Sequence, residues 1–329
     1  MIAECSGMMP KDRKHLEEST ARILARHLIE TEAIPGLKGF EVVRSEVTRG
    51  DHQFDFLLRK GKRELILDVI PCTPAVKRIA TYPHEATDES ERVHLEDLAG
   101  LTSVNTQAAI LFISNNRVAE FFIPDFHTDF KYTQTLLELK DRLNVMAVAL
   151  RREKERTEPT RVRPLKIPWK LIESEAKDRG SYMVVLKLPE SRKIKIGSLK
   201  EHRFEEGFYV YVGSAKAKKK DCSPRIHILS SRIDRHRQQD KGNPHWHIDY
   251  LRPFAEFCAA LPIRTKDDLE CKIADSLRDL TGDETPDRFG STDCRCQSHL
   301  FYFPDDPLTN SDFKRVVQYY RFERLVDRA

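Results

Sequence analysis

The stretch FYVYVGSA, residues 208–215, decides the fold of the second half of this chain. Aromatic and apolar residues alternate along it, which is typical of a β-strand because successive side chains point to opposite faces of a sheet. Tyr209 and Tyr211 therefore share one face, and the apolar residues that alternate with them share the other. The strand ends in Gly-Ser-Ala, small residues that let another part of the chain approach the backbone closely.

The regions around this strand predict a sheet with helices in each half of the chain. In the second half, we expect strands at residues 181–188, 193–196 and 299–303, and helices at 224–237, 266–280 and 312–326. In the first half, we expect strands at residues 41–49, 53–59, 64–71 and 108–114, and helices at 11–32, 89–99 and 133–143. The predicted fold class is therefore α/β (α+β), with a mixed sheet in the first half.

A change in composition separates the two halves. Residues 151–163 hold many charges and almost no apolar side chains, and Pro164 and Pro168 follow. A chain of 329 residues suits two domains better than one. We therefore expect a domain at residues 1–150, a linker at 151–178 and a second domain at 179–329.

Polar side chains with reactive groups recur on the predicted helices of the second domain. Arg225, Leu229, Arg232 and His236 are spaced four, three and four residues apart, which places them on one helix face. Glu270 lies beside the apolar stripe of the next helix. A carboxylate in that position is expected at the border between the core and a cleft.

Short motifs in the second half resemble the GIY-YIG nuclease superfamily. The tripeptides are Gly180-Ser181-Tyr182 and Tyr211-Val212-Gly213. Two longer segments, HWHIDYL at residues 245–251 and FGSTDCRCQSHL at 289–300, are similar to a branch of that superfamily with WHIDYL and FGSxDCxCxSHL segments. The resemblance covers about residues 178–305. It implies a small antiparallel sheet flanked by helices and a metal-dependent endonuclease activity.

The resemblance also implies a role for each matching residue. Tyr182 would act as the general base, which requires positive charge nearby because a free tyrosine has a pKa of about 10. Tyr211 would position the water or the scissile phosphate. Arg232 would stabilise charge on the phosphate oxygens, and His236 would donate to the phosphate or help to move the proton. Glu270 would hold one Mg²⁺ or Mn²⁺ ion.

A run of basic residues follows the second tyrosine motif. The net charge of the chain is only +4, so a preference for nucleic acid would have to arise from local charge. Within the resemblance we expect nucleic-acid contacts from Lys216, Lys218, Lys219, Lys220, Arg225 and Arg235. Standing alone, such a run is usually a solvated face, and that interpretation stays open.

Three cysteines and a histidine raise the possibility of a zinc site. They are Cys271, Cys294, Cys296 and His299. Their spacing differs from the usual Cys-x-x-Cys knuckle. Thiols and a histidine packed beside the active site remain the alternative.

Two acidic residues face each other in a predicted hairpin of the first half. A turn at residues 60–63 pairs positions whose numbers sum to 123, so Asp55 lies opposite Asp68 on one face. Like charges in opposed positions are destabilising unless something positive lies between them. A divalent cation would satisfy that requirement.

The same region resembles the nuclease domain of the sugar fermentation stimulation protein family, which has a PD-(D/E)XK-like core. The matching segments are residues 34–37, 54–58, 67–69, 94–98 with Thr87, and 109–112, within about residues 15–150. Where that core requires a lysine two residues after the second acid, this chain has Ile70. We therefore expect a degenerate domain that positions nucleic acid, unless Lys77 replaces the missing lysine. A purely structural domain is the alternative.

Composition bears on two questions, whether the chain spans a membrane and whether its cysteines are reduced. The chain lacks a run of about 18 apolar residues, which predicts no membrane span, and its seven cysteines fit reduced thiols in the cytoplasm. The sequence predicts an endonuclease acting on DNA more readily than on RNA. A non-catalytic nucleic-acid-binding adaptor and an RNA-processing nuclease are the alternatives, and the sequence does not identify protein partners.

Overall fold

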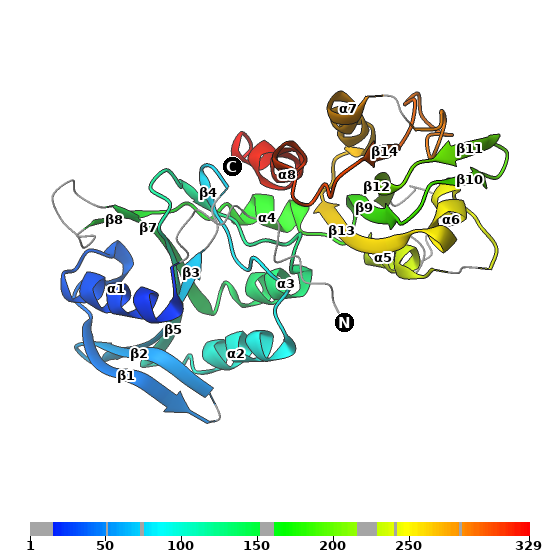
Figure 1. Ribbon diagram of the computed structural model, residues 1–329. Coiled ribbons are helices and arrows are strands. Elements are labelled where there is room, and N and C mark those ends of the chain that lie inside the picture. The colour runs from blue at the N-terminus through cyan, green and yellow to red at the C-terminus, as the bar shows by residue number, and fades with distance from the viewer. Residues whose placement is uncertain are drawn as a thin grey trace. The chain divides into compact units, whose positions relative to one another are not determined.

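The computed structural model describes residues 16–50, 52–72, 76–151, 161–215, 229–239, 242–282 and 285–329 (Figure 1). Contacts between residues divide these ranges into two units. The N-terminal unit comprises residues 16–173 together with Leu325–Ala329, and the C-terminal unit comprises Ser174–Arg324. The predicted fold class is confirmed, because one unit holds a large mixed sheet and the other a small antiparallel sheet.

A six-stranded sheet forms the centre of the N-terminal unit, in the order β1-β2-β3-β5-β7-β8. Its strands are β1 (Glu41–Arg49), β2 (His52–Lys60), β3 (Arg63–Cys72), β5 (Thr106–Ser114), β7 (Leu143–Arg151) and β8 (Arg161–Pro164). The pairs β3-β5 and β5-β7 are parallel and the others antiparallel. Two short strands, β4 (Ile79–Ala80) and β6 (Phe121–Phe122), pair separately.

Helices cover both faces of this sheet (Figure 1). Helix α1 (Glu18–Glu30) packs on one face through Ala21, Ala25 and Leu28. Helices α2 (Glu89–Gly100) and α3 (Phe130–Leu139) pack on the opposite face. Because both faces are covered, the central strands are apolar along most of their length, as β5 shows.

Part of the segment expected to be a linker is regular structure. Strand β8 pairs with β7 at the edge of the sheet, and helix α4 (Trp169–Glu175) follows, with Ile172 fully buried. An edge strand has a neighbour on one side only, so a charged sequence is compatible with it. Charge density alone therefore does not distinguish a linker from an edge strand.

The C-terminal unit contains a four-stranded antiparallel sheet in the order β13-β9-β12-β14. Its strands are β9 (Gly180–Leu188), β12 (Gly207–Ala215), β13 (Glu256–Arg264) and β14 (Leu300–Phe303), and a separate hairpin joins β10 (Arg192–Lys195) to β11 (Glu201–Phe204). The predicted alternation in β12 is confirmed. Tyr209 and Tyr211 belong to the core on one face, whereas Val210 and Val212 belong to the core on the other.

Different helices complete the two cores of the C-terminal unit. Helices α5 (Leu229–Arg237) and α6 (His247–Leu251) contribute to the core that contains the tyrosines. Helices α7 (Glu270–Thr281) and α8 (Ser311–Gln318) contribute to the other. The remaining helical elements are η1 (Pro35–Leu37), η2 (Arg252–Phe254), η3 (Tyr319–Glu323) and α9 (Arg324–Val326). Within the ranges that the structure describes, none of the helices has both the length and the hydropathy needed to cross a bilayer.

Candidate functional site

Tyr182 and Gly213 lie directly opposite each other in the pairing of β9 with β12. The tyrosine ring lies over the glycine backbone so closely that a Cβ atom at residue 213 would be 2.5 Å from both Cζ and Oη of Tyr182. Real Cβ contacts are not that short, so the tyrosine can occupy this position only because residue 213 lacks a side chain. The small residues that end β12 therefore have the role expected of them, a close approach between two parts of the chain.

A hydrogen bond joins the first tyrosine to the predicted helix histidine. Oη of Tyr182 lies 2.8 Å from Nε2 of His236 on α5. His236 is completely buried, and its ring centroid is 5.7 Å from that of Tyr211. His236 therefore lies between the two tyrosines in the interior of the unit.

Burial dominates the acid–base properties of both tyrosines. It raises the pKa of Tyr182 above its usual range, although the neighbouring Arg232 acts in the opposite direction through its charge and a hydrogen bond. Burial likewise raises the pKa of Tyr211, and the nearby Tyr182 and Glu270 act in the same direction. Among the described residues, desolvation of Tyr182 therefore has a larger effect on its pKa than the positive charge of Arg232.

Arg232 and Glu270 meet at the end of β12. Nη1 of Arg232 donates a hydrogen bond to the carbonyl oxygen of Ser214, and the Ser214 hydroxyl donates to Oε2 of Glu270 at 2.5 Å. Glu270 is the first residue of α7, where the helix dipole stabilises a negative charge. Its side chain is 20% exposed, as expected for a carboxylate at the rim of a core. The predicted catalytic residues thus gather where β12 ends and β9 begins.

The segment HWHIDYL builds the wall beside Arg232. The ring of Trp246 lies 5.4 Å from His236, and the guanidinium of Arg232 lies over it, 5.4 Å from the ring centre. Asp249 is buried and accepts hydrogen bonds from the backbone of the residues before α6. It also forms an ion pair with Arg235 at 2.9 Å. Arg235, which was predicted to bind nucleic acid, therefore has an ion-pair partner within the unit.

The segment FGSTDCRCQSHL builds the wall beside the second tyrosine. The Phe289 ring packs edge-on against Tyr211, and Gly290 follows with a φ of +72°. A Cβ atom at Gly290 would lie 2.9 Å from Cε2 of Tyr211, so glycine is required by both space and backbone conformation. The backbone N–H of Gly290 donates to Nδ1 of His247 at 3.0 Å. Burial lowers the pKa of His247, which favours the neutral ring that accepts this bond.

Arg252 is a structural residue that sequence reasoning missed. It is 3% exposed, and its guanidinium donates to the carbonyl oxygens of His236 and Arg237 at the end of α5 and to that of Ala255. The last carbonyls of a helix accept no hydrogen bond from within it, so Arg252 stabilises the end of α5. It thereby fixes the position of His236. A basic residue directly after an apolar helix was the only signal in the sequence.

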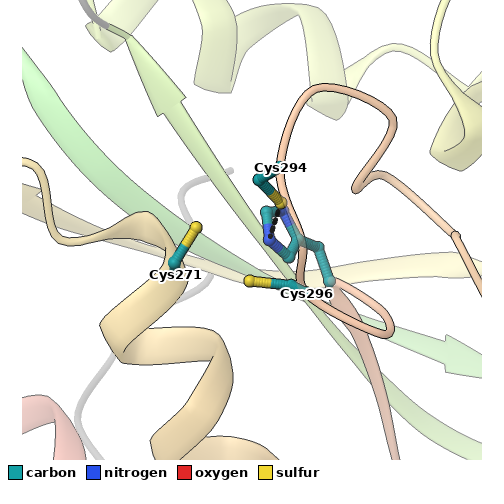
Figure 2. Close-up of side chains that lie close together, drawn as sticks. Cys271, Cys294 and Cys296 are labelled. Atoms are coloured by element: carbon teal, nitrogen blue, oxygen red, sulfur yellow. Dashed lines mark hydrogen bonds between the residues drawn. The ribbon is translucent and has the colours of Figure 1, made fainter.

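The remaining predicted residues of this half divide into two groups. The zinc candidates Cys271, Cys294, Cys296 and His299 are brought together (Figure 2). The predicted nucleic-acid ligands Lys216, Lys218, Lys219, Lys220 and Arg225 lie outside the described residues.

The N-terminal unit contains the predicted acid pair. The expected register is confirmed, because Phe56 pairs with Leu67 and Leu57 with Ile66. The backbone N–H of Asp55 donates to Oδ1 of Asp68 at 3.0 Å. The two acids line a cleft of about 540 Å³.

Protein groups lie against the two facing carboxylates and compensate their charge. Oδ2 of Asp55 accepts from the backbone N–H of Val69 at 2.8 Å, and Oδ1 pairs with Nε of Arg22 at 2.9 Å. Oδ2 of Asp68 pairs with Nε2 of His94. All four carboxylate oxygens therefore have partners within the unit.

The position of the missing lysine is filled by an apolar side chain. Ile70 is partly buried and packs against the core beneath α2 and α3. Lys77 is exposed and is not among the described residues that line the cleft. The sequence-based hypothesis that Lys77 replaces the lysine therefore receives no support.

Burial raises the pKa of Asp55 to about 6, and the negative charge of Asp68 acts in the same direction against the Val69 hydrogen bond and Arg22. The hydrogen bond to Asp68 raises the pKa of His94. Both groups bind protons more tightly in the folded state than in the unfolded chain. Both therefore make the N-terminal unit less stable as pH rises.

Each half of the chain is similar to a known domain. Residues 19–156 match the profile of the family described as sugar fermentation stimulation protein RE domain, and residues 181–321 match a domain of unknown function, DUF123. The sugar fermentation stimulation protein homolog of Methanothermobacter thermautotrophicus is 29% identical over 113 residues, which cover 34% of this chain and 47% of that protein. The chain thus spans about half the length of this relative.

The chain is also similar to one solved structure, that of Pyrococcus furiosus SfsA in complex with Ca²⁺. The two sequences are 22% identical, and the TM-score is 0.38. The match covers 44% of this chain and 62% of the Pyrococcus furiosus chain. The predicted resemblance of the first half to the sugar fermentation stimulation protein family is confirmed by the family profile and the curated relative.

The raised pKa of Asp55 predicts an effect on the pH dependence of stability. Between pH 3.8 and about 6 the folded chain retains a proton on Asp55 that the unfolded chain releases, so stability falls as pH rises. Asp55→Asn should reduce this fall, because asparagine does not titrate. Hydrogen exchange of the β3 and β5 amides in increasing urea, measured at several pH values, reports the stability of this unit.

The matched control for Asp55→Asn is Glu96→Gln, which changes an exposed carboxyl on α2 of the same unit. It should leave the slope of stability against pH as in the unchanged chain. An equal slope for the chain with and without Asp55→Asn would contradict the assigned burial of that carboxyl.

Proposed function

We propose that the C-terminal unit is a metal-dependent nuclease of the GIY-YIG type that hydrolyses phosphodiester bonds of DNA. The observation that carries this proposal is the gathering of five reactive residues from β9, β12, α5 and α7 at one end of one sheet. They are Tyr182, Tyr211, Arg232, His236 and Glu270. The tripeptides around the two tyrosines and the two longer segments that form the walls support the same assignment.

The hydrogen bond between Tyr182 and His236 supports a proton relay. The attacking water forms a bond to phosphorus and passes its proton to Oη of Tyr182, while Tyr182 passes its own proton to Nε2 of His236. The bond from phosphorus to the leaving oxygen breaks in the same reaction. Tyr182 does not have to become a phenolate beforehand, which reconciles this role with the raised pKa of the buried phenol.

Arg232 provides positive charge next to the two tyrosines. Its hydrogen bond to the Ser214 carbonyl and its contact with the Trp246 ring hold the guanidinium in place before any substrate binds. A preorganised cation stabilises charge that develops on the phosphate oxygens without a cost of reorientation. We therefore assign Arg232 to stabilisation of the transition state.

Glu270 fits a site for a hard divalent cation. Its carboxylate is partly exposed and lies beside the Ser214 hydroxyl, which provides a further oxygen. Mg²⁺ and Mn²⁺ prefer oxygen ligands and retain several waters, which suits a single carboxylate. When bound, such an ion supplies positive charge beside the phosphate.

The N-terminal unit is assigned to positioning of nucleic acid and not to cleavage. Its acid pair is already compensated by Arg22, His94 and backbone N–H groups, and Ile70 takes the place of the expected lysine. The open cleft beside these residues and the match to the sugar fermentation stimulation protein RE domain support a binding role.

Cleavage of labelled substrates tests the proposed function. The full chain is incubated with single-stranded, duplex and branched DNA and with RNA, in Mg²⁺, in Mn²⁺ or in EDTA. We expect cleavage of DNA that depends on the metal, and a loss of roughly 10²-fold or more in Glu270→Gln. Glu256→Gln, an exposed glutamate of β13, is the control and should cut normally.

Binding of DNA without cleavage in any metal would contradict the nuclease assignment and favour an adaptor. Cleavage of RNA alone would contradict the proposal that DNA is the substrate. Undiminished cleavage by Glu270→Gln would remove Glu270 from the metal site.

The relay makes a second prediction about His236. Tyr182→Phe should lower the rate by about 10²–10⁴-fold, because the hydroxyl that accepts the proton is lost. His236→Gln keeps a polar group near Tyr182 but does not take up a proton. It should lower the rate similarly. Rates measured across pH, with His202→Gln on β11 as the control, check this.

The activity of His236→Gln also distinguishes a proton relay through His236 from a purely positioning role of that residue. If His236→Gln retains nearly full activity and the same pH profile, His236 only holds the Tyr182 ring in place.

A further inference from the structure

Three thiols and one imidazole converge beside the candidate nuclease site. Cys271 lies in the first turn of α7, and Cys294 and Cys296 lie in the loop before β14 (Figure 2). Together with His299, each residue offers one ligand atom, and these atoms all lie within 4.8 Å of one another. Figure 2 shows the sulfur atoms of helix and loop directed into the same space.

We propose that Cys271, Cys294, Cys296 and His299 bind a single Zn²⁺ ion with tetrahedral geometry. Zinc–sulfur and zinc–nitrogen bonds of about 2.3 and 2.0 Å place tetrahedral ligands roughly 3.5–3.8 Å apart. Sγ of Cys294 already lies 3.5 Å from Nε2 of His299. The remaining separations are close enough for small side-chain rotations to complete the tetrahedron.

The donor set distinguishes this site from the one at Glu270. Three thiolates and one imidazole are soft or intermediate ligands, which bind zinc well and Mg²⁺ poorly. All four positions of a tetrahedron are filled by protein, so the site is structural and has no open position for a substrate. The two metals would therefore occupy neighbouring but separate sites.

A carboxylate lies near the ring nitrogen of His299 that faces away from the sulfur atoms. With Nε2 directed at the sulfur cluster, Nδ1 lies 3.6 Å from Oε1 of Glu270. A metal-bound histidine commonly presents its other ring nitrogen to a carboxylate, which fixes the tautomer and the ring orientation. His299 is 1% exposed, so its ring has little freedom to turn away.

The ion would hold the loop that forms the wall of the candidate nuclease site. Residues 285–299 contain no helix or strand, yet this described segment includes Phe289 and Gly290, which contact Tyr211. A loop without regular hydrogen bonding loses conformational entropy when it is ordered. Metal bonds between this loop and Cys271 would offset that loss and fix the spacing of Glu270 from Tyr211.

Metal analysis of the full chain, purified with a reductant, tests the zinc proposal. We expect about one zinc per chain, released by a mercurial that blocks thiols. After replacement by Co²⁺, the intense visible bands of a tetrahedral thiolate site should appear. Removal of zinc should lower the melting temperature of the C-terminal unit by about 5–15 °C. It should also accelerate hydrogen exchange in residues 285–299.

Matched variants locate the site. Cys294→Ser and Cys296→Ser should lose most of the zinc and the cobalt bands, whereas Cys258→Ser, a half-buried cysteine on β13, should retain both. Tyr182→Phe should retain zinc whatever its effect on cleavage, so the zinc proposal and the nuclease proposal fail separately.

Two results would overturn the zinc site. One is reduced, folded full-length chain that binds neither zinc nor cobalt. The other is a disulfide between two of the three cysteines in the chain as purified. Retention of full zinc content by Cys294→Ser would also contradict the assigned ligands.

Discussion

The contact between the Tyr182 ring and the backbone of Gly213 is the constraint on which the rest of the C-terminal unit depends. Because residue 213 has no side chain, the ring lies against β12 with its hydroxyl 2.8 Å from His236. The buried histidine in turn fixes the face that α5 presents, and Arg232 on the same helix reaches the Ser214 carbonyl at the next position of β12. One close approach between neighbouring strands therefore sets the positions of a phenol, an imidazole and a guanidinium.

The carboxylates of the two units have different surroundings. In the N-terminal unit, each oxygen of Asp55 and Asp68 is engaged by a backbone N–H, Arg22 or His94. In the C-terminal unit, Glu270 remains at a partly exposed rim, where its charge is stabilised by a helix N-terminus. Ile70 in the place of the expected lysine, together with the gathering of Tyr182, Arg232 and Glu270, is the basis of the proposal that the chemistry lies in the C-terminal unit.

Sequence reasoning recovered features that follow from short-range geometry. The alternation of β12 and the register of the β2-β3 hairpin depend on side-chain periodicity and turn length, and both are confirmed. The sequence did not predict β13, because Pro262 within it argues against the interior of a strand. Proline is tolerated there because β13 lies at the edge of the sheet, which only the topology reveals.

Features that depend on long-range contacts could not be predicted from the sequence either. Ile23 of α1 is 70% exposed although it is strongly apolar, and the alanines of that helix pack against the sheet. Small residues carry little weight in a hydrophobic pattern, although they allow a helix to approach closely. The sequence assigned Arg235 to nucleic acid as part of a basic run, and it did not predict the ion pair of Arg235 with Asp249.

The most direct test of where the chemistry lies compares two variants of the full chain on one DNA substrate in Mg²⁺. The first combines Asp55→Ala with Asp68→Ala, and the second is Tyr182→Phe. A nuclease centred on Tyr182 predicts that the double variant cleaves within about threefold of the unchanged chain, while Tyr182→Phe loses at least about 10²-fold. Loss of cleavage in the double variant together with full cleavage by Tyr182→Phe would contradict the account and place the nuclease in the N-terminal unit.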